Sequence, residues 1–176
     1  MAIRQRDLRA SAQYTFKSTG PRTLNEARLL NKQTAFLSHS HQDSELAKGL
    51  QELLRENGWD VYIDWEDTSM PEQTNKVTAQ KIKDKINQAT WFLFLATQNS
   101  MASRWCPWEI GYADAVKMYD RIIIIPTEDD QGRFHGNEYL QLYRRLIDAS
   151  SSQINRQKGV AVFDPGSTSG KWVQFL

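Results

Sequence analysis

The chain has 176 residues with 22 basic and 21 acidic side chains, and its formal net charge of +1 gives no overall field that would attract nucleic acid or a membrane surface as a partner. Cys106 is its one cysteine, which excludes an intramolecular disulfide framework and favours a reducing compartment, expected to be the cytoplasm. No apolar run approaches the roughly 20 residues that span a bilayer. The length predicts one domain with room for an extension.

The first 32 residues are expected to be an extension that precedes a domain over residues 33–176. Basic side chains outnumber the single acidic one, Asp7, in residues 1–22: they are Arg4, Arg6, Arg9, Lys17 and Arg22. We interpret this segment as a solvated extension, with a transit peptide or a phosphate-binding arm as alternatives. Thr23 and Glu26 have the spacing of a capping box, which predicts a short helix over about residues 24–32.

The next elements alternate between strand and helix. The segment TAFLS (34–38) predicts a buried strand, and Asp43 can then cap a helix. That helix has one apolar face and should stop at Gly58. The face consists of Leu46, Leu50, Leu53 and Leu54. The segment DVYID (60–64) predicts a second strand, and the polar loop WEDTSMPEQTN (65–75) leads to a helix marked by Val77, Ile82 and Ile86.

The second half continues the alternation. We expect strands at WFLFLA (91–96), RIIIIP (121–126) and GVAVF (159–163), with helices at PWEIGYADAVKMY (107–119) and EYLQLYRRLIDA (138–149). Strands that are apolar on both faces and alternate with helices predict the α/β class, here five strands in a parallel sheet with helices on both faces. Ligands bind beyond the carboxyl ends of such strands. The functional surface is therefore expected at residues 38–43, 64–73, 97–108 and 128–136.

The sequence His39-Ser40-His41-Gln42-Asp43 allows two interpretations. Two histidines and an aspartate at alternate positions resemble a metal site, which would make the protein a metallohydrolase. The other interpretation is a strand that ends, turns and enters a helix capped by Asp43. The chain has only one further histidine, His135, so a metal site would lack ligands. We therefore favour the turn and expect no bound metal.

The segment SRWCPWEIGYADA (103–115) contains a candidate catalytic acid. Proline fits best at the first position of a helix, which would make Pro107 the first helical residue and Glu109 the third. A carboxylate in the first turn faces the positive end of the helix dipole, so we expect Glu109 to be ionised at neutral pH. Trp105 lies four residues before it. The alternative is a structural glutamate at a helix start, with Trp105 and Trp108 in the core.

The segments FLSHSHQD, GWDVYIDWED, WFLFLATQNSMASRWCPWEIGYA and IIIIP together resemble a bacterial TIR domain over about residues 33–164. The resemblance implies a flavodoxin-like fold with a five-stranded parallel sheet. It also implies cleavage of NAD⁺ at the bond between nicotinamide and ribose, with Glu109 as the catalytic residue. The product would be ADP-ribose or a cyclic ADP-ribose signal of the kind made in Thoeris-type antiphage defence. The sequence departs from the family pattern in the N-terminal extension and in the missing glycine of the loop at 65–75.

The resemblance also suggests substrate-binding roles and partners. Ser38, His39 and Ser40 are expected to hydrogen-bond ribose or phosphate, Trp105 to line the site or stack on a ring, and Trp65 to face the adenine. NAD⁺ is expected as substrate, with no separate cofactor. Head-to-tail self-association through the loop at 65–75 and a downstream effector that senses the product are further expectations. The main alternative is a non-catalytic TIR interaction module, but Glu109 favours an enzyme because an adaptor does not require it.

Overall fold

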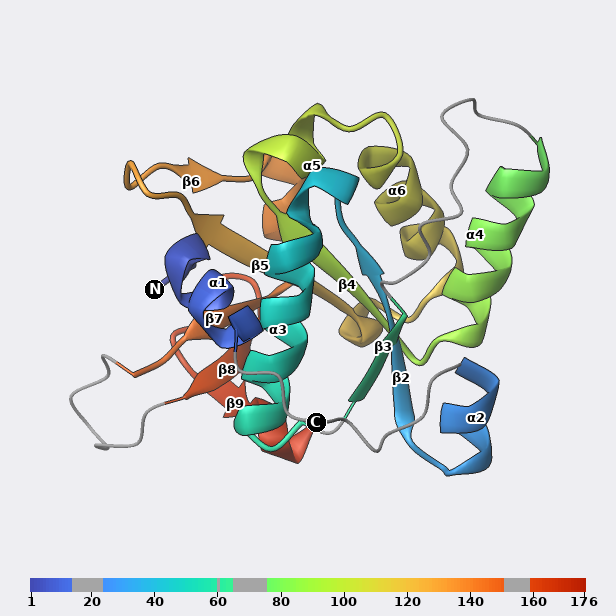
Figure 1. The fold of residues 1–176 in the computed structure, drawn as a ribbon, viewed down its shortest axis with the longest axis horizontal. Coiled ribbons are helices and arrows are strands. Elements are labelled where there is room, and N and C mark those ends of the chain that lie inside the picture. Colours follow the sequence, from blue (N-terminus) through green and yellow to red (C-terminus); the bar gives the residue numbers. More distant parts are fainter. Residues whose placement is uncertain (14–23, 60, 65–75, 151–158) are drawn as a thin grey trace.

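The computed structural model describes residues 1–13, 24–59, 61–64, 76–150 and 159–176, which form one mixed sheet with helices on both faces (Figure 1). The strands are β1 (Ile3–Arg4), β2 (Gln33–Ser38), β3 (Val61–Asp64), β4 (Trp91–Ala96), β5 (Ile122–Glu128), β6 (Phe134–His135), β7 (Arg144–Asp148), β8 (Val160–Phe163) and β9 (Gly170–Trp172). The α-helices are α1 (Gln5–Gln13), α2 (Leu24–Leu29), α3 (Ser44–Glu56), α4 (Lys76–Gln88), α5 (Gln98–Ala102) and α6 (Cys106–Val116). Short 3₁₀ helices are η1 (His41–Asp43), η2 (Tyr119–Arg121), η3 (Glu138–Leu142) and η4 (Val173–Phe175).

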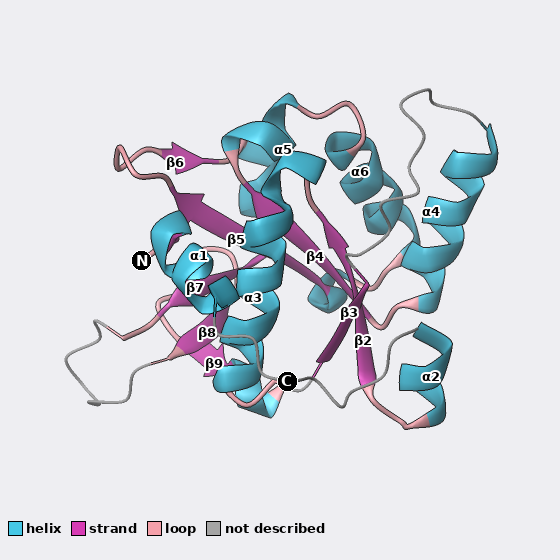
Figure 2. Cartoon of the chain, in the orientation of Figure 1, coloured by secondary structure: helices cyan, strands magenta, loops and turns pink. Residues whose placement is uncertain are grey.

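The sheet has the strand order β3-β2-β4-β5-β7-β8-β9. The first five strands of this order are parallel, whereas β8 and β9 pair antiparallel. Two short strands flank the far end of β5: β1 joins it in parallel and β6 antiparallel. The α/β class, with a parallel-dominated sheet between helices, is therefore confirmed (Figure 2).

Residues 122–125 of β5 show why the middle of the sheet is apolar on both faces. Successive side chains of a strand point to opposite faces of the sheet. Ile123 and Ile125 accordingly pack in the core cluster with α1 and α3, whereas Ile122 and Ile124 pack in the cluster with α4 and α6. Both faces are covered along this stretch of β5, so its side chains are all apolar.

The fifth parallel strand differs from the expected one. We predicted a helix over residues 138–149, but these residues form η3 and then β7, which pairs in parallel with β5. The segment GVAVF does form a strand, β8, but it runs antiparallel to β7. The buried residues Leu140, Tyr143 and Leu146 are spaced by three, which imitates a helical face although the first lies in η3 and the last in β7.

The N-terminal residues are part of the packed domain. We expected a solvated extension, but this is wrong for residues 1–13, because Ile3 and Leu8 are buried in the core with α3. Helix α1 approaches α3 so closely that a Cβ on Gly49 would stand 1.8 Å from the Leu8 carbonyl oxygen. Glycine is therefore required at this crossing, despite its usual cost inside a helix.

Most other helix predictions agree with the structure, with two exceptions. Helix α3 ends as expected before Gly58, which has a positive φ of 82°. The helix marked by Val77, Ile82 and Ile86 is α4, but its buried face contains Thr78, Ile82 and Ile86, whereas Val77 is 65% exposed. The helix predicted for about 24–32 ends at Leu29, and its capping residue Thr23 lies outside the described residues. No helix within the described ranges is long and apolar enough to cross a bilayer.

Candidate functional site

A buried hydrogen bond joins the end of β2 to the first turns of α6. The Ser38 hydroxyl donates to Glu109 Oε2 over 2.6 Å, and both residues are buried. Ser38 is the last residue of β2, opposite Phe94 of β4. Helix α6 packs beside these strands through Ile110 and Ala113. The serine and the glutamate, which are 71 residues apart in sequence, therefore meet at the carboxyl edge of the sheet, where α/β proteins bind ligands.

Burial controls the ionisation of Glu109. Loss of solvation raises the pKa of this carboxyl to about 7, although the hydrogen bond from Ser38 acts in the opposite direction. Our expectation of a fully ionised glutamate at neutral pH was therefore wrong. Helix α6 begins at Cys106, so Glu109 is its fourth residue rather than its third, and its side chain is 4% exposed. The sequence pattern around Pro107 predicted where the helix starts to within one residue. It could not show that other segments bury the side of the first turn that carries Glu109.

The loop after Ser38 holds two of the predicted substrate-binding residues. His39 Nδ1 lies 2.9 Å from the Leu37 carbonyl oxygen, and because a carbonyl only accepts, Nδ1 carries the proton in this contact. Burial lowers the pKa of His39, which favours the neutral ring. The Ser40 hydroxyl accepts a hydrogen bond from the Gln42 backbone N–H and caps η1. Both side chains are half-buried beside the Ser38–Glu109 pair.

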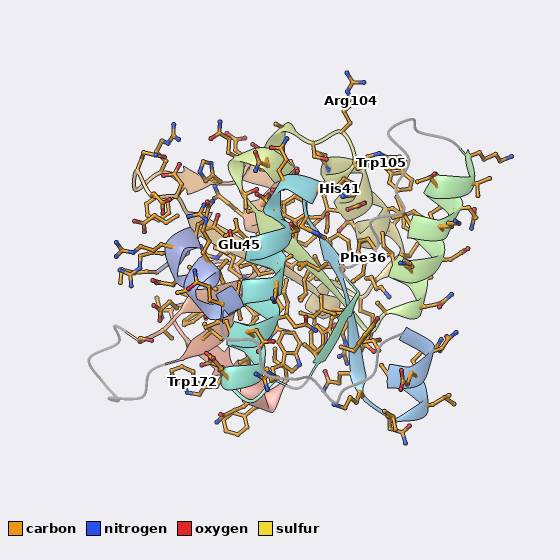
Figure 3. The ribbon with its side chains drawn as sticks, in the orientation of Figure 1. Phe36, His41, Glu45, Arg104, Trp105 and Trp172 are labelled. Carbon is orange, nitrogen blue, oxygen red and sulfur yellow. The ribbon has the colours of Figure 1, made fainter. Side chains whose placement is uncertain are left out.

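Trp105 lies at the N-terminal end of α6, one turn before Glu109. Its ring is half-buried and meets the Trp108 ring edge to face, with 5.4 Å between centroids. Trp108 in turn stacks on Tyr112, and the Lys83 ammonium lies over both of these rings. Figure 3 shows Trp105 and His41 at the same end of the molecule. This half-buried position is compatible with both expectations for Trp105, which were packing in the core and lining the substrate site.

Trp65, the residue expected to face adenine, lies outside the described residues, as does the whole loop at 65–75 proposed for self-association. The structure thus brings Ser38 and Glu109 into direct contact. It also places His39, Ser40 and Trp105 in the segments that adjoin this pair.

Asp43 has a different role from the one expected. It occupies the N-cap position of α3, but its carboxylate makes no capping hydrogen bond. Instead Oδ2 accepts from the Thr97 hydroxyl over 2.5 Å, and Oδ1 accepts from the Asn99 side-chain amide over 2.7 Å. Sequence reasoning missed this contact, although the run Thr97-Gln98-Asn99 after a buried strand was a signal. With both oxygens engaged in this way, Asp43 is poorly placed to bind a metal. Within the described residues no cluster of three or more His, Cys, Asp or Glu side chains could hold one.

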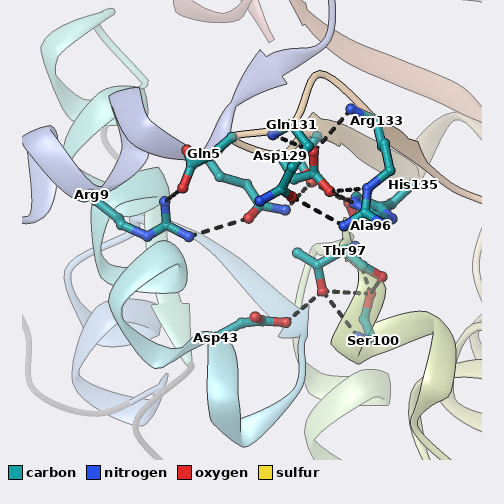
Figure 4. A network of polar contacts seen from close by, with 12 residues as sticks. Gln5, Arg9, Asp43, Ala96, Thr97, Ser100, Asp129, Gln131, Arg133 and His135 are labelled. Carbon is teal, nitrogen blue, oxygen red and sulfur yellow. Dashed lines mark hydrogen bonds and ion pairs between the residues drawn. The ribbon is translucent and has the colours of Figure 1, made fainter.

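A second group of polar side chains lies farther along the same edge, in the hairpin between β5 and β6 (Figure 4). Asp129 accepts hydrogen bonds from the backbone N–H groups of Gln131 and Arg133, from the Arg133 side chain and from the His135 ring. Burial raises the pKa of Asp129, but these hydrogen bonds outweigh it and hold the pKa well below its usual range. A polar cavity of about 210 Å³ is lined by this hairpin, by α1 and by Asp43.

Comparison with known proteins identifies the class of protein. Residues 35–157 match the TIR domain family, and the chain belongs to this family. It is 34% identical over 110 residues, or 61% of its length, to the Bacillus cereus (strain MSX-D12) protein named "Probable 3' cyclic ADP-D-ribose synthase ThsB'". It is 30% identical over 81 residues, or 44% of its length, to the Cytobacillus dafuensis protein named "Putative cyclic ADP-D-ribose synthase TIR2". The matched regions span 57% and 21% of these two relatives. The predicted TIR resemblance is confirmed.

Proposed function

We propose that this TIR protein cleaves NAD⁺ at the bond between nicotinamide and ribose, with Glu109 as the catalytic carboxylate. The observation that carries the proposal is the buried pair of Ser38 and Glu109 at the carboxyl edge of the sheet. A glutamate kept out of water and held by one short hydrogen bond is poised to interact strongly with a positive charge. The names of the two relatives support a reaction that makes ADP-ribose products.

The proposed reaction needs one fixed carboxylate. The bond between ribose C1′ and the nicotinamide nitrogen breaks, and its electron pair neutralises the positive ring, so nicotinamide leaves as a neutral molecule without a general acid. Positive charge develops on the ribose, and the ionised form of Glu109 stabilises it. Addition of water to C1′ with loss of a proton gives ADP-ribose. Addition of a nucleophilic group of the same molecule, with loss of a proton, gives a cyclic product.

The remaining roles follow from this reaction. Ser38, His39 and Ser40 would bind the ribose or a phosphate, Trp105 would line the site, and Trp65 would face the adenine. The names of the relatives favour a cyclic product, and we propose that it acts as a signal in antiphage defence, read by an effector in the cytoplasm. NAD⁺ is the substrate in this scheme, and no separate cofactor takes part.

The decisive experiment incubates the purified protein with NAD⁺ and measures nicotinamide, ADP-ribose and cyclic ADP-ribose by chromatography. We expect release of nicotinamide with an equal amount of ADP-ribose products, and we expect the Glu109→Gln variant to lose this release. Intact NAD⁺ after prolonged incubation over a wide range of protein concentration would instead favour a non-catalytic interaction module.

We also propose that activity depends on head-to-tail association of subunits through the loop at 65–75. Trp65 and Met70 place two large apolar side chains in this otherwise polar segment, a composition typical of contact surfaces. Specific activity should then rise with protein concentration, and Met70→Glu should suppress it without changing the helical content seen by circular dichroism. A constant specific activity in a protein that sediments as a monomer throughout would contradict this mode of activation.

A further inference from the structure

A chain of buried hydrogen bonds leads from the N-terminal helix α1 to the loop after β2. The Gln5 side-chain amide donates to the Thr127 hydroxyl over 3.0 Å, and that hydroxyl donates to the Ala96 carbonyl oxygen over 2.6 Å. The next residue, Thr97, donates to Asp43. Gln5, Thr127, Thr97 and Asp43 are all buried, so water cannot readily replace these contacts.

Asp43 links these hydrogen bonds to the loop that follows Ser38. Its backbone N–H donates to the Ser40 carbonyl oxygen over 2.8 Å, which closes the turn directly after Ser38 and His39. Its carboxylate is held by Thr97, which caps α5, and by Asn99 in the first turn of that helix. The residues after Ser38 leave the sheet, so strand pairing no longer fixes them. Asp43 therefore holds the loop after Ser38 in place beyond the point where the pairing of β2 with β4 ends.

The opposite end of the chain of contacts is also fixed. Strand β1 pairs with the far end of β5, where Ile3 lies opposite Thr127, and Leu8 is fully buried against α3. The contact of α1 with Gly49 leaves no room for α1 to shift towards α3. Gln5 is therefore held at a defined position above Thr127.

We propose that Asp43 and Thr97 are positioning residues through which α1 and β5 keep the loop after β2, and thus Ser38, in register with Glu109. This role rests on the proposed function of Glu109 and extends it. None of these residues needs to touch the substrate. The N-terminal residues 1–13 would then contribute to activity as well as to packing.

The test compares two substitutions at one buried position with a matched control. Thr97→Val keeps the shape of the side chain and removes the hydroxyl, whereas Thr97→Ser keeps the hydroxyl. Thr34→Val is the control because Thr34 is equally buried and bonds to Thr90 at the opposite end of the same strands. Ser100→Ala is a second control. Ser100 and Thr97 together form the capping box of α5, and this substitution removes the Ser100 hydroxyl but leaves the hydrogen bond from Thr97 to Asp43.

We expect Thr97→Val to lower kcat for nicotinamide release about tenfold with little change in KM, because misplacement of a reacting group lowers the rate of the chemical step. Thr97→Ser should stay within about twofold of wild type, as should both controls. Gln5→Leu, at the far end of the chain of contacts, should lower kcat in the same direction but by less. Equal kcat values for Thr97→Val and Thr34→Val would overturn the proposal.

A second readout does not depend on turnover. The pKa of Glu109 can be measured by carbon-13 NMR of its carboxyl group without substrate, with Glu109→Gln used for assignment. The Ser38 hydroxyl donates a hydrogen bond to this carboxyl, and the buried Cys106 thiol interacts with it electrostatically. Since the Ser38 hydrogen bond lowers the pKa of Glu109, displacement of Ser38 in Thr97→Val should raise it, whereas Thr34→Val should not. An unchanged pKa in Thr97→Val would overturn the positioning role. A wild-type protein that leaves NAD⁺ intact would instead refute only the proposed reaction.

Discussion

Two carboxylates at the same edge of the sheet are held in opposite ways. Glu109 is buried beside α6 and receives one hydrogen bond from the described residues, which comes from Ser38. Asp129, in the hairpin after β5, receives two backbone and two side-chain hydrogen bonds. The pKa of Glu109 is raised to about 7, whereas that of Asp129 is held well below its usual range.

The difference in pKa supports the proposed catalytic role of Glu109 and indicates a structural role for Asp129. Hydrogen-bond donors satisfy the charge of Asp129, so that carboxylate stabilises its hairpin and gains little from a new cationic partner. Glu109 has only the Ser38 hydroxyl as a donor among the described residues, so a developing positive charge nearby would stabilise its ionised form strongly. This contrast supports Glu109 as the catalytic residue.

The largest expected effect is on turnover in Glu109→Gln. The substitution keeps the size of the side chain and removes its charge, so nicotinamide release should fall by at least about a hundredfold, the scale of losing one electrostatic group that stabilises a transition state. Glu45→Gln, which alters an exposed acid near the same edge, should retain activity. Near-normal turnover in Glu109→Gln would exclude this carboxylate from the mechanism.

The second effect concerns stability. The folded protein holds the Glu109 proton up to a pKa of about 7, whereas the unfolded chain releases it near pH 4.5. The free energy of unfolding should therefore decrease as the pH rises between these values and stay lower above pH 7. Glu109→Gln removes this cost and should raise the free energy of unfolding at pH 8 by about 1–3 kcal/mol. Urea unfolding at pH 5 and pH 8 measures the change, and a loss of stability at pH 8 would contradict the assignment.

A smaller effect is expected from Ser38→Ala. The Ser38 hydrogen bond lowers the pKa of Glu109, so its removal should shift the rise of kcat/KM to higher pH. In the wild type this rise should be centred near pH 7 because the ionised carboxylate is the active form. At pH 7 the variant should be about tenfold slower and should recover part of this loss at higher pH. A profile that keeps its midpoint would show that the serine does not tune the glutamate.

The smallest effect is expected from Asp129→Asn. This change removes the charge that organises the hairpin, so the melting temperature at neutral pH should fall slightly, while nicotinamide release should stay within about twofold of wild type. Because the folded pKa of Asp129 is lowered, its stabilisation is present above the ordinary pKa of an aspartate and is lost as the pH falls below it. The difference in melting temperature should therefore narrow in acid. A large loss of activity would show that the two carboxylates are not functionally separate.

Sequence reasoning predicted the central strands and, to within one residue, the start of α6, because apolar runs and helix-start residues are local signals. The catalytic role of Glu109 stays a prediction. It failed at β7, where the spacing of Leu140, Tyr143 and Leu146 imitated a helix. It also failed at Asp43, whose partners Thr97 and Asn99 are more than 50 residues away. The raised pKa of Glu109 could not be predicted either, since it depends on burial by distant segments.

The separation of Ser38 and Glu109 also matters during protein synthesis. The two residues are 71 positions apart, and the strands that bring them together include β4, which is made after Ser38 and before Glu109. A nascent chain that has not yet reached α6 contains the serine but not the glutamate. Premature or truncated products that stop before residue 109 therefore cannot form the pair, and under the proposed function they would leave the NAD⁺ of the cell untouched.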